Sequence, residues 1–153
     1  MRPRRLRKND VIRALVRENY INVENLIYPI FVVEGNKIKE EIPSMPDVYR
    51  FSIDMLSEEL EELIKLNIKT ILLFGVPSVK DEYGTQAYNE NGIVQKAIKY
   101  IKRNYPEIYV ITDVCLCGYT THGHCGIVKD GEILNDETLK ILSKIALSHA
   151  YSG

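Results

Sequence analysis

Apolar residues along the chain fall into two kinds of pattern. Three short stretches, residues 26–33, 69–74 and 108–114, are almost continuously apolar. Such runs are typical of strands that are covered on both faces of a sheet. Between and after them, apolar residues recur at helical spacing, which predicts helices from 52 to about 67, from 92 to 103 and from 137 to about 150. Strands that alternate with helices in this way predict a parallel sheet covered by helices.

Local signals refine these elements. Ser52 and Asp54 are placed to cap the first of these helices, and Asn135 and Asp136 to cap the third. Pro29 predicts an edge or irregular position for the first strand, because proline lacks a backbone N–H. Residues 37–49 contain two prolines and are predicted to be irregular, residues 78–91 form a polar loop, and Asp130–Gly131 marks a turn. A short helix is predicted near residues 11–16. The predicted inward faces of the three longer helices comprise Leu56, Leu60, Leu63 and Ile64; Ile93, Ala97, Ile98 and Ile101; and Leu139, Leu142, Ile145 and Ala146.

The spacing of the strands bears on the architecture. Their centres lie near Ile30, Leu72 and Ile111, so one strand-helix unit takes roughly forty residues, which suits a long (β/α)₈ barrel. A small doubly wound domain is the alternative. We favour the N-terminal part of a (β/α)₈ TIM barrel over residues 25–153, with about three strand-helix units and an end where a fourth strand would begin. An extended basic arm, residues 1–24, precedes it. Half a barrel would expose an apolar interior and an open sheet edge, so the isolated chain is expected to be poorly soluble or paired with a complementary part.

Charge and hydropathy exclude some functions. The net charge of −1 argues against a general nucleic-acid binder, although residues 1–17 carry seven basic side chains against the single acid Asp10. We interpret this arm as solvated or subunit-contacting rather than as a nucleic-acid or anionic-surface contact. No apolar run approaches the ~20 residues that span a bilayer, and no secretory signal is apparent. A cytoplasmic protein that binds no membrane is therefore expected.

The richest chemistry lies just after the third strand. All three cysteines, Cys115, Cys117 and Cys125, share a glycine-rich segment of eleven residues with His122 and His124. Three thiolates at this spacing can converge on one Zn²⁺ at ~2.3 Å and leave a fourth position for water or substrate. Either histidine could instead complete the shell and make the site structural. An odd number of cysteines in a reducing compartment argues against a disulfide framework.

Other interpretations stay open for these residues. The cysteines could be inert core residues, or Cys115 and Cys117 could form a redox pair. Asp113 ends the third strand, where active sites gather in parallel α/β folds, and could exchange protons, orient an ammonium group or cap a turn. His149, in the third helix, is predicted to be a surface or packing residue.

Residues 113–126 resemble the metal loop of the porphobilinogen synthase family, also called 5-aminolevulinate dehydratases. Further stretches resemble other landmarks of that family in the same order: residues 2–7, 27–35, 42–46, 49–52, 72–77 and 135–138. Gly118 is one departure, since many members carry proline there. The resemblance covers essentially the whole chain.

The resemblance implies a (β/α)₈ barrel whose N-terminal arm wraps a neighbouring subunit, commonly in an octamer. It implies condensation of two 5-aminolevulinate molecules to porphobilinogen, with loss of two waters, in haem biosynthesis. Cys115, Cys117 and Cys125 match the zinc ligands of the zinc-dependent branch, Asp113 matches an active-site aspartate, and His124 lies beside the metal as a further catalytic candidate. The family also uses two Schiff-base lysines on later strands, whose motifs are absent here.

Two further expectations follow from the resemblance. It suggests an allosteric magnesium ion as a second cofactor, but this sequence offers no ligand pattern for one. A complementary C-terminal half is a possible partner. The rival functions are a non-catalytic zinc-binding or assembly module and a small doubly wound domain with redox thiols.

Overall fold

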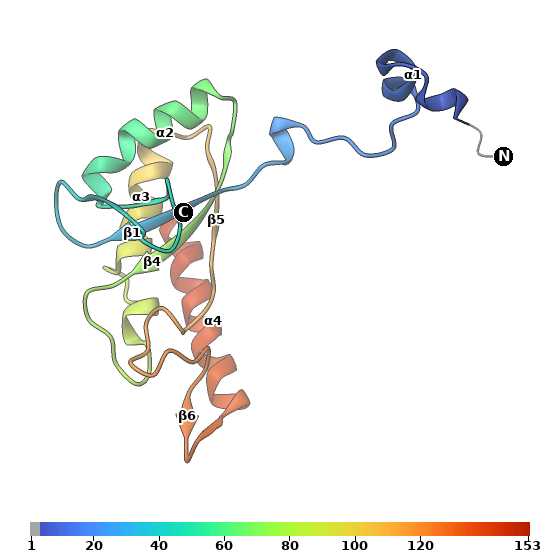
Figure 1. Ribbon diagram of the computed structural model, residues 1–153. Helices are drawn as coiled ribbons and strands as arrows, with labels where there is room; N and C mark the ends of the chain where they lie inside the picture. The colour runs from blue at the N-terminus through green and yellow to red at the C-terminus, as the bar shows by residue number, and fades with distance from the viewer. Residues whose placement is uncertain (1–3) are drawn as a thin grey trace.

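The main sheet of the fold has five strands (Figure 1). The structure is a computed structural model, and it describes residues 4–153. The strands lie in the order β2-β3-β1-β4-β5, and β1, β3, β4 and β5 run parallel, whereas β2 is antiparallel to β3. Their bounds are Tyr28–Val33 for β1, Lys39–Glu41 for β2, Tyr49–Phe51 for β3, Thr70–Val76 for β4 and Tyr109–Thr112 for β5. The three strands predicted from the sequence are thus β1, β4 and β5, and the parallel sheet is confirmed.

Helices connect and follow these strands. Helix α2 (Leu56–Lys65) leads into β4, α3 (Ile93–Asn104) joins β4 to β5, and α4 (Asn135–Ser152) comes last. The three predicted helices are confirmed, with ends that differ by a few residues. This succession of parallel strands and crossover helices is the N-terminal part of a (β/α)₈ barrel.

The two faces of the sheet differ in burial. On one face, Ile30, Ile71 and Leu73 are fully buried in a core with α2 and α3. On the other face, Phe31 and Phe74 are half-buried and stack with ring centroids 5.1 Å apart. In a (β/α)₈ barrel the first face meets the helices and the second lines the interior. The predicted inward residues of α2 and α3 lie in or against this core.

The segment between β1 and α2 corrects two predictions. Residues 37–49 were expected to be irregular, but they contribute β2 and the start of β3. The side chains of Ser52 and Asp54 explain the difference, because they accept the backbone N–H groups of Ile38 (2.9 Å) and Lys37 (2.8 Å). They therefore fix this hairpin and do not cap α2, which follows a 3₁₀ turn, η3 (Ile53–Met55), and has no side-chain cap.

Pro29 does not place β1 at an edge of the sheet. The strand lies between β3 and β4, so the expectation of an edge strand was wrong. However, β3 pairs only with Phe31 and Val32, whereas β4 pairs with the whole of β1. The first half of β1 thus has a free side, which is where a proline is tolerated.

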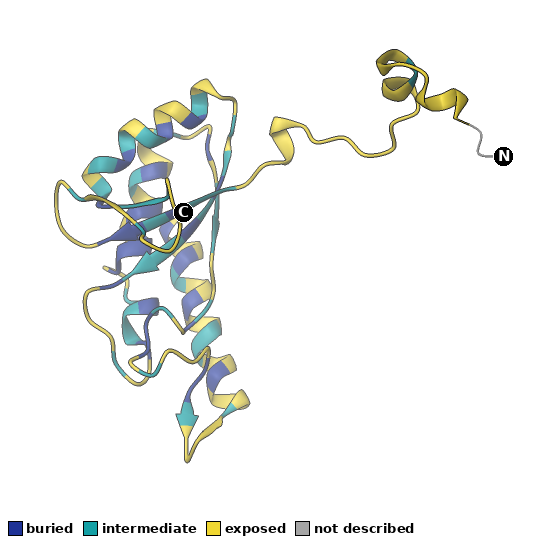
Figure 2. Cartoon of the chain, viewed as in Figure 1, coloured by how far each residue is buried: buried dark blue, intermediate teal, exposed yellow. Residues whose placement is uncertain are grey.

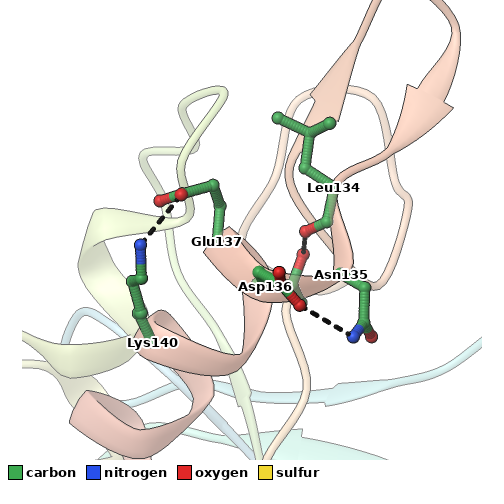
Figure 3. A network of polar contacts seen from close by, with 6 residues as sticks. Leu134, Asn135, Asp136, Glu137 and Lys140 are labelled. Atoms are coloured by element: carbon green, nitrogen blue, oxygen red, sulfur yellow. Dashed lines mark hydrogen bonds and ion pairs between the residues drawn. The ribbon is translucent and has the colours of Figure 1, made fainter.

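The start of α4 also differs from prediction (Figure 3). Asn135 and Asp136 lie inside the first turn, and the cap position is Leu134, whose carbonyl accepts the Thr138 hydroxyl at 2.7 Å. The buried positions of α4 are Thr138, Ile145, His149 and Ser152, whereas Leu139 and Ala146 are exposed. The inward face therefore includes two polar residues: the Thr138 hydroxyl accepts the Ile127 N–H, and the His149 Nδ1 lies 3.1 Å from the Thr112 hydroxyl, whereas the His149 Nε2 is buried without a partner.

A short hairpin precedes α4. Strands β6 (Val128–Lys129) and β7 (Glu132–Ile133) are antiparallel and joined by the predicted Asp130–Gly131 turn. Both turn residues have positive φ, 52° and 84°, which is typical of a two-residue hairpin turn.

Residues 4–27 extend away from the sheet and are exposed except for the half-buried Ile12 (Figures 1 and 2). They contain the 3₁₀ turns η1 (Arg5–Arg7) and η2 (Val23–Asn25) and the predicted short helix, α1 (Asp10–Leu15), whose N-cap Asn9 accepts the Ile12 N–H at 2.9 Å. The expectations for residues 1–3, including Arg2, lie outside the described part. Within residues 4–153, none of the helices has the length and apolar character needed to cross a membrane.

Candidate metal centre

The three cysteines form one compact cluster after β5. Their sulfur atoms all lie within 4.8 Å of one another, and the Sγ atoms of Cys115 and Cys117 are 3.3 Å apart. Tetrahedral thiolates around a zinc ion, with ~2.3 Å bonds, lie about 3.8 Å from each other. Soft thiolates at this separation suit zinc, so the donor set fits the predicted ion. In the described part of the chain, no other group of three or more potential ligands is found.

The first half of the loop is held by Leu116, which is fully buried between two cysteines. Its carbonyl accepts the backbone N–H groups of Tyr119 (2.8 Å) and Thr120 (3.0 Å), which closes a tight turn. Tyr119 and Thr120 are buried as well. Because Leu116 points into the protein, the side chains of Cys115 and Cys117 on either side of it meet on the outer side of the loop.

The second half of the loop returns Cys125 to the same place. The Thr120 hydroxyl donates to the carbonyl of His124 at 3.1 Å. Gly126 is buried, and a Cβ there would lie 2.6 Å from Ile133 and 2.7 Å from the Thr138 hydroxyl. The same hydroxyl accepts the Ile127 N–H at 3.0 Å. The start of α4 therefore fixes the end of the cysteine loop, which carries Cys125.

The thiols of the cluster shift one another's pKa values. Burial opposes ionisation of Cys115, but hydrogen bonds from the Cys117 N–H and the other two thiols outweigh it and lower the pKa of Cys115. Its neighbours respond in the opposite direction: hydrogen bonding to Cys115 raises the pKa of Cys117 to about 11 and also raises the pKa of Cys125. A divalent cation would draw all three to the thiolate form.

Asp113 lies two residues before the cluster, at the end of β5. Its backbone N–H donates to the carbonyl of Leu73 at 3.2 Å, so the strand pairing continues to this residue. By strand alternation it shares the barrel-interior face with Ile111. Burial raises the pKa of Asp113, and a hydrogen bond from the Val114 backbone only partly offsets this. A carboxyl with a raised pKa is better suited to proton exchange near neutral pH.

The histidines take different positions. His122 accepts the His124 N–H at Nδ1 (3.1 Å), and its Nε2 lies 3.3 Å from the carbonyl of Glu82. His124 is exposed, and neither ring belongs to the group of potential ligands. His149 is buried and packs below β5 with Nδ1 3.1 Å from the Thr112 hydroxyl, so the packing interpretation is confirmed.

The sequence analysis missed the part of the site that comes from the loop after β4. Residues 78–91 contain a 3₁₀ turn, η4 (Thr85–Tyr88), and Asp81 forms a parallel bridge with Thr120 of the cysteine loop. Asp81 precedes Gly84 and Thr85 by three and four residues, and aspartate and glycine are common in turns, so a signal was available. That this turn would meet the cysteines was not evident from it.

The fold and the cluster together define an N-terminal part of a (β/α)₈ barrel with three clustered cysteines at the carboxyl end of a strand. Residues 1–153 match the family model described as Delta-aminolevulinic acid dehydratase. The chain therefore belongs to the delta-aminolevulinic acid dehydratase family.

Individual relatives agree with this assignment. The chain is 58% identical over 152 residues to a delta-aminolevulinic acid dehydratase of Methanothermus sociabilis, covering 99% of this chain and 47% of that protein. It is 53% identical to the protein of the same name from Bacillus subtilis (strain 168), again with 99% and 47% covered. It superposes with a TM-score of 0.95, at 37% identity, on delta-aminolevulinic acid dehydratase (porphobilinogen synthase) from Toxoplasma gondii ME49, solved in complex with the reaction product porphobilinogen. That match covers 100% of this chain and 44% of the other, so the chain spans about half the length of these relatives.

Proposed function

We propose that the protein to which this chain belongs condenses two 5-aminolevulinate molecules to porphobilinogen, and that residues 1–153 supply its zinc site. Family membership supports the reaction, and the reaction product bound in the Toxoplasma gondii structure agrees with it. The observation that carries the proposal is the cluster of Cys115, Cys117 and Cys125 beside Asp113. Reduced thiols of this kind also favour a cytoplasmic location.

The roles of the residues follow from their positions. Cys115, Cys117 and Cys125 would hold a zinc ion, which would supply a Lewis acid for polarising a substrate carbonyl. Asp113, on the interior face with a raised pKa, accepts or returns a proton, or orients the substrate ammonium group. His124 is exposed and directly precedes Cys125 in the chain, which makes it a candidate for contact with a substrate.

A chimera tests this proposal in a full-length context. Residues 1–153 replace the matching half of the Methanothermus sociabilis relative, and porphobilinogen formation is followed with zinc and a reducing agent present. We expect turnover that requires zinc, and a loss of about a hundredfold or more when Asp113→Asn removes the acid-base group. The unaltered relative is the control for the assay.

The contradicting result is equally clear. A chimera that folds and holds one zinc ion per chain, yet forms no porphobilinogen while the control does, would reject the proposed activity. Turnover that persists after Cys117→Ser and in the presence of a chelator would reject the zinc role.

The exposed arm supports a second part of the proposal, that the protein is a homo-oligomer assembled through residues 1–24. Ile21 is 88% exposed and Leu15 78%, and such apolar side chains in series are typical of a contact surface. Light scattering of the chimera with and without the arm tests this. Assembly that depends on the arm, without turnover in any mixture, would favour the rival function of a zinc-binding assembly module.

A further inference from the structure

The turn after β4, residues 81–85, is a closed hydrogen-bonded unit, here called the Asp81 turn. The Asp81 carboxylate accepts the backbone N–H groups of Tyr83 (2.8 Å) and Thr85 (3.1 Å) and the Thr85 hydroxyl. Burial opposes ionisation of Asp81, but these hydrogen bonds outweigh it and lower its pKa. The carboxylate therefore stays ionised near neutral pH and holds the turn as a multiple acceptor.

The backbone of this turn is joined to the cysteine loop. The Asp81 N–H donates to the carbonyl of Tyr119 (3.3 Å), and the Thr121 N–H donates to the carbonyl of Asp81 (3.1 Å). The His122 ring adds a contact to the carbonyl of Glu82 at 3.3 Å. All three contacts fall between Cys117 and Cys125, on the segment that sets the separation of these two ligands.

A side-chain contact joins the same two segments on the buried side. Gly84 has a φ of +61°, and a Cβ there would lie 2.6 Å from the Leu116 Cδ2, 3.4 Å from Tyr119 and 3.5 Å from Thr120. Leu116 is the buried residue that turns Cys115 and Cys117 outward. The Asp81 turn thus supports both the start and the middle of the cysteine loop.

We propose that the Asp81 turn sets the metal affinity of the cysteine cluster, with Asp81 as a positioning residue that acts through the backbone of Tyr119 and Thr121. This rests on the proposed zinc site. Asp81 contacts neither the metal nor substrate: it holds the loop in a geometry in which the three sulfur atoms already lie together. Without it the ligands must be ordered when the metal binds, and supporting residues of this kind typically contribute ten- to a hundredfold in affinity.

Zinc dissociation constants are measured on the reduced chimera described above, in which residues 1–153 are either the original chain or a variant, by competition with a chromophoric chelator. We expect Asp81→Ala to weaken zinc binding by about tenfold or more, and Asp81→Asn, which keeps one acceptor oxygen, to weaken it less. The matched control is Asp54→Ala, because Asp54 also accepts a backbone N–H, that of Lys37, but does so in the hairpin before α2. The control is expected to bind zinc as the original chain does.

A second readout separates positioning from general loss of structure. Cobalt(II) bound in place of zinc gives absorption bands that report ligand number and angles, and circular dichroism reports the folded fraction. We expect Asp81→Ala to shift the cobalt bands while the dichroism is unchanged. If Asp81→Ala does not fold, Thr85→Val, which removes only the hydroxyl donor to Asp81, is expected to give a smaller change in the same direction.

The outcomes are distinguishable. A reduced original chain that binds no zinc overturns the proposed zinc site itself. An original chain that binds zinc, with Asp81 and Thr85 variants of equal affinity and identical cobalt spectra, overturns the positioning role and leaves the zinc site standing.

Discussion

The loops that follow β4 and β5 lie side by side and divide the work of the site between them. The loop after β5 carries the candidate chemical groups, Asp113 and the three cysteines. The loop after β4 carries no metal ligand, yet its Asp81 turn is hydrogen-bonded to the cysteine loop, and its Gly84 contacts Leu116. One loop is recognisable by its residue types, and the other only by its contacts. A binding site therefore has a part that sequence motifs reveal and a part that they do not.

The largest effect is expected in the chemical loop, from Cys117→Ser. Binding free energies of about 10–16 kcal/mol for thiolate zinc sites are shared among a few ligands, so losing one should cost at least about a hundredfold in affinity. Chelator competition measures this. Thr121→Ser, an exposed position in the same loop, is the control and should bind as the original chain does. Equal affinities for the Cys117 variant and the original chain would show that the metal lies elsewhere.

The pH dependence of zinc binding should distinguish the roles of the two loops, because the cysteines of one titrate and Asp81 of the other does not. Cys117 and Cys125 have raised pKa values, so both are protonated at neutral pH and must release protons to bind zinc. The affinity should therefore rise with pH below these pKa values, by up to about a hundredfold per pH unit if two protons leave. Asp81 has a lowered pKa, so it stays ionised over the same range. The Asp81→Ala profile should run parallel to that of the original chain between pH 6 and 8, and converging profiles would contradict this division.

Two glycines allow the supporting contact to be measured apart from backbone strain. Gly84 and Gly123 both have positive φ, +61° and +74°, but a Cβ at Gly123 meets nothing within 4 Å. Alanine at either position incurs the backbone cost, and only Gly84→Ala also displaces Leu116. We expect Gly84→Ala to lower the free energy of unfolding by about 1–3 kcal/mol more than Gly123→Ala, measured in urea. Equal losses would mean that Leu116 does not depend on this contact.

A smaller effect is expected at His149, which packs against β5, on the pH dependence of the free energy of unfolding. Burial lowers the pKa of His149, so the folded chain resists protonation, whereas the unfolded chain takes up a proton near pH 6.5. The free energy of unfolding of the metal-free chain should be unaffected above that pH and should fall as the pH drops below it. His149→Gln should show a shallower decline, and His124→Gln, at an exposed position, is the control. Identical slopes in all three would show that His149 does not contribute.

The accuracy of the sequence analysis follows the same division between chemistry and support. Continuous apolar runs identified β1, β4 and β5, because strands buried under helices need such runs. Cysteine clustering identified the candidate metal centre, because three thiols within eleven residues can readily converge, as their sulfur atoms do. The analysis was wrong where polar side chains find partners distant in sequence. Ser52 and Asp54 bind the hairpin at residues 37–38, and Thr138 and His149 turn the buried face of α4.

The most direct test of the central claim is X-ray absorption at the zinc edge, on the reduced chimera loaded with one equivalent of zinc. The cluster of Cys115, Cys117 and Cys125 predicts three sulfur neighbours at ~2.3 Å and one lighter oxygen or nitrogen neighbour. Four sulfur neighbours, which would need a thiol from outside residues 1–153, would contradict an open catalytic position. A shell of oxygen and nitrogen alone would contradict the three-thiolate site.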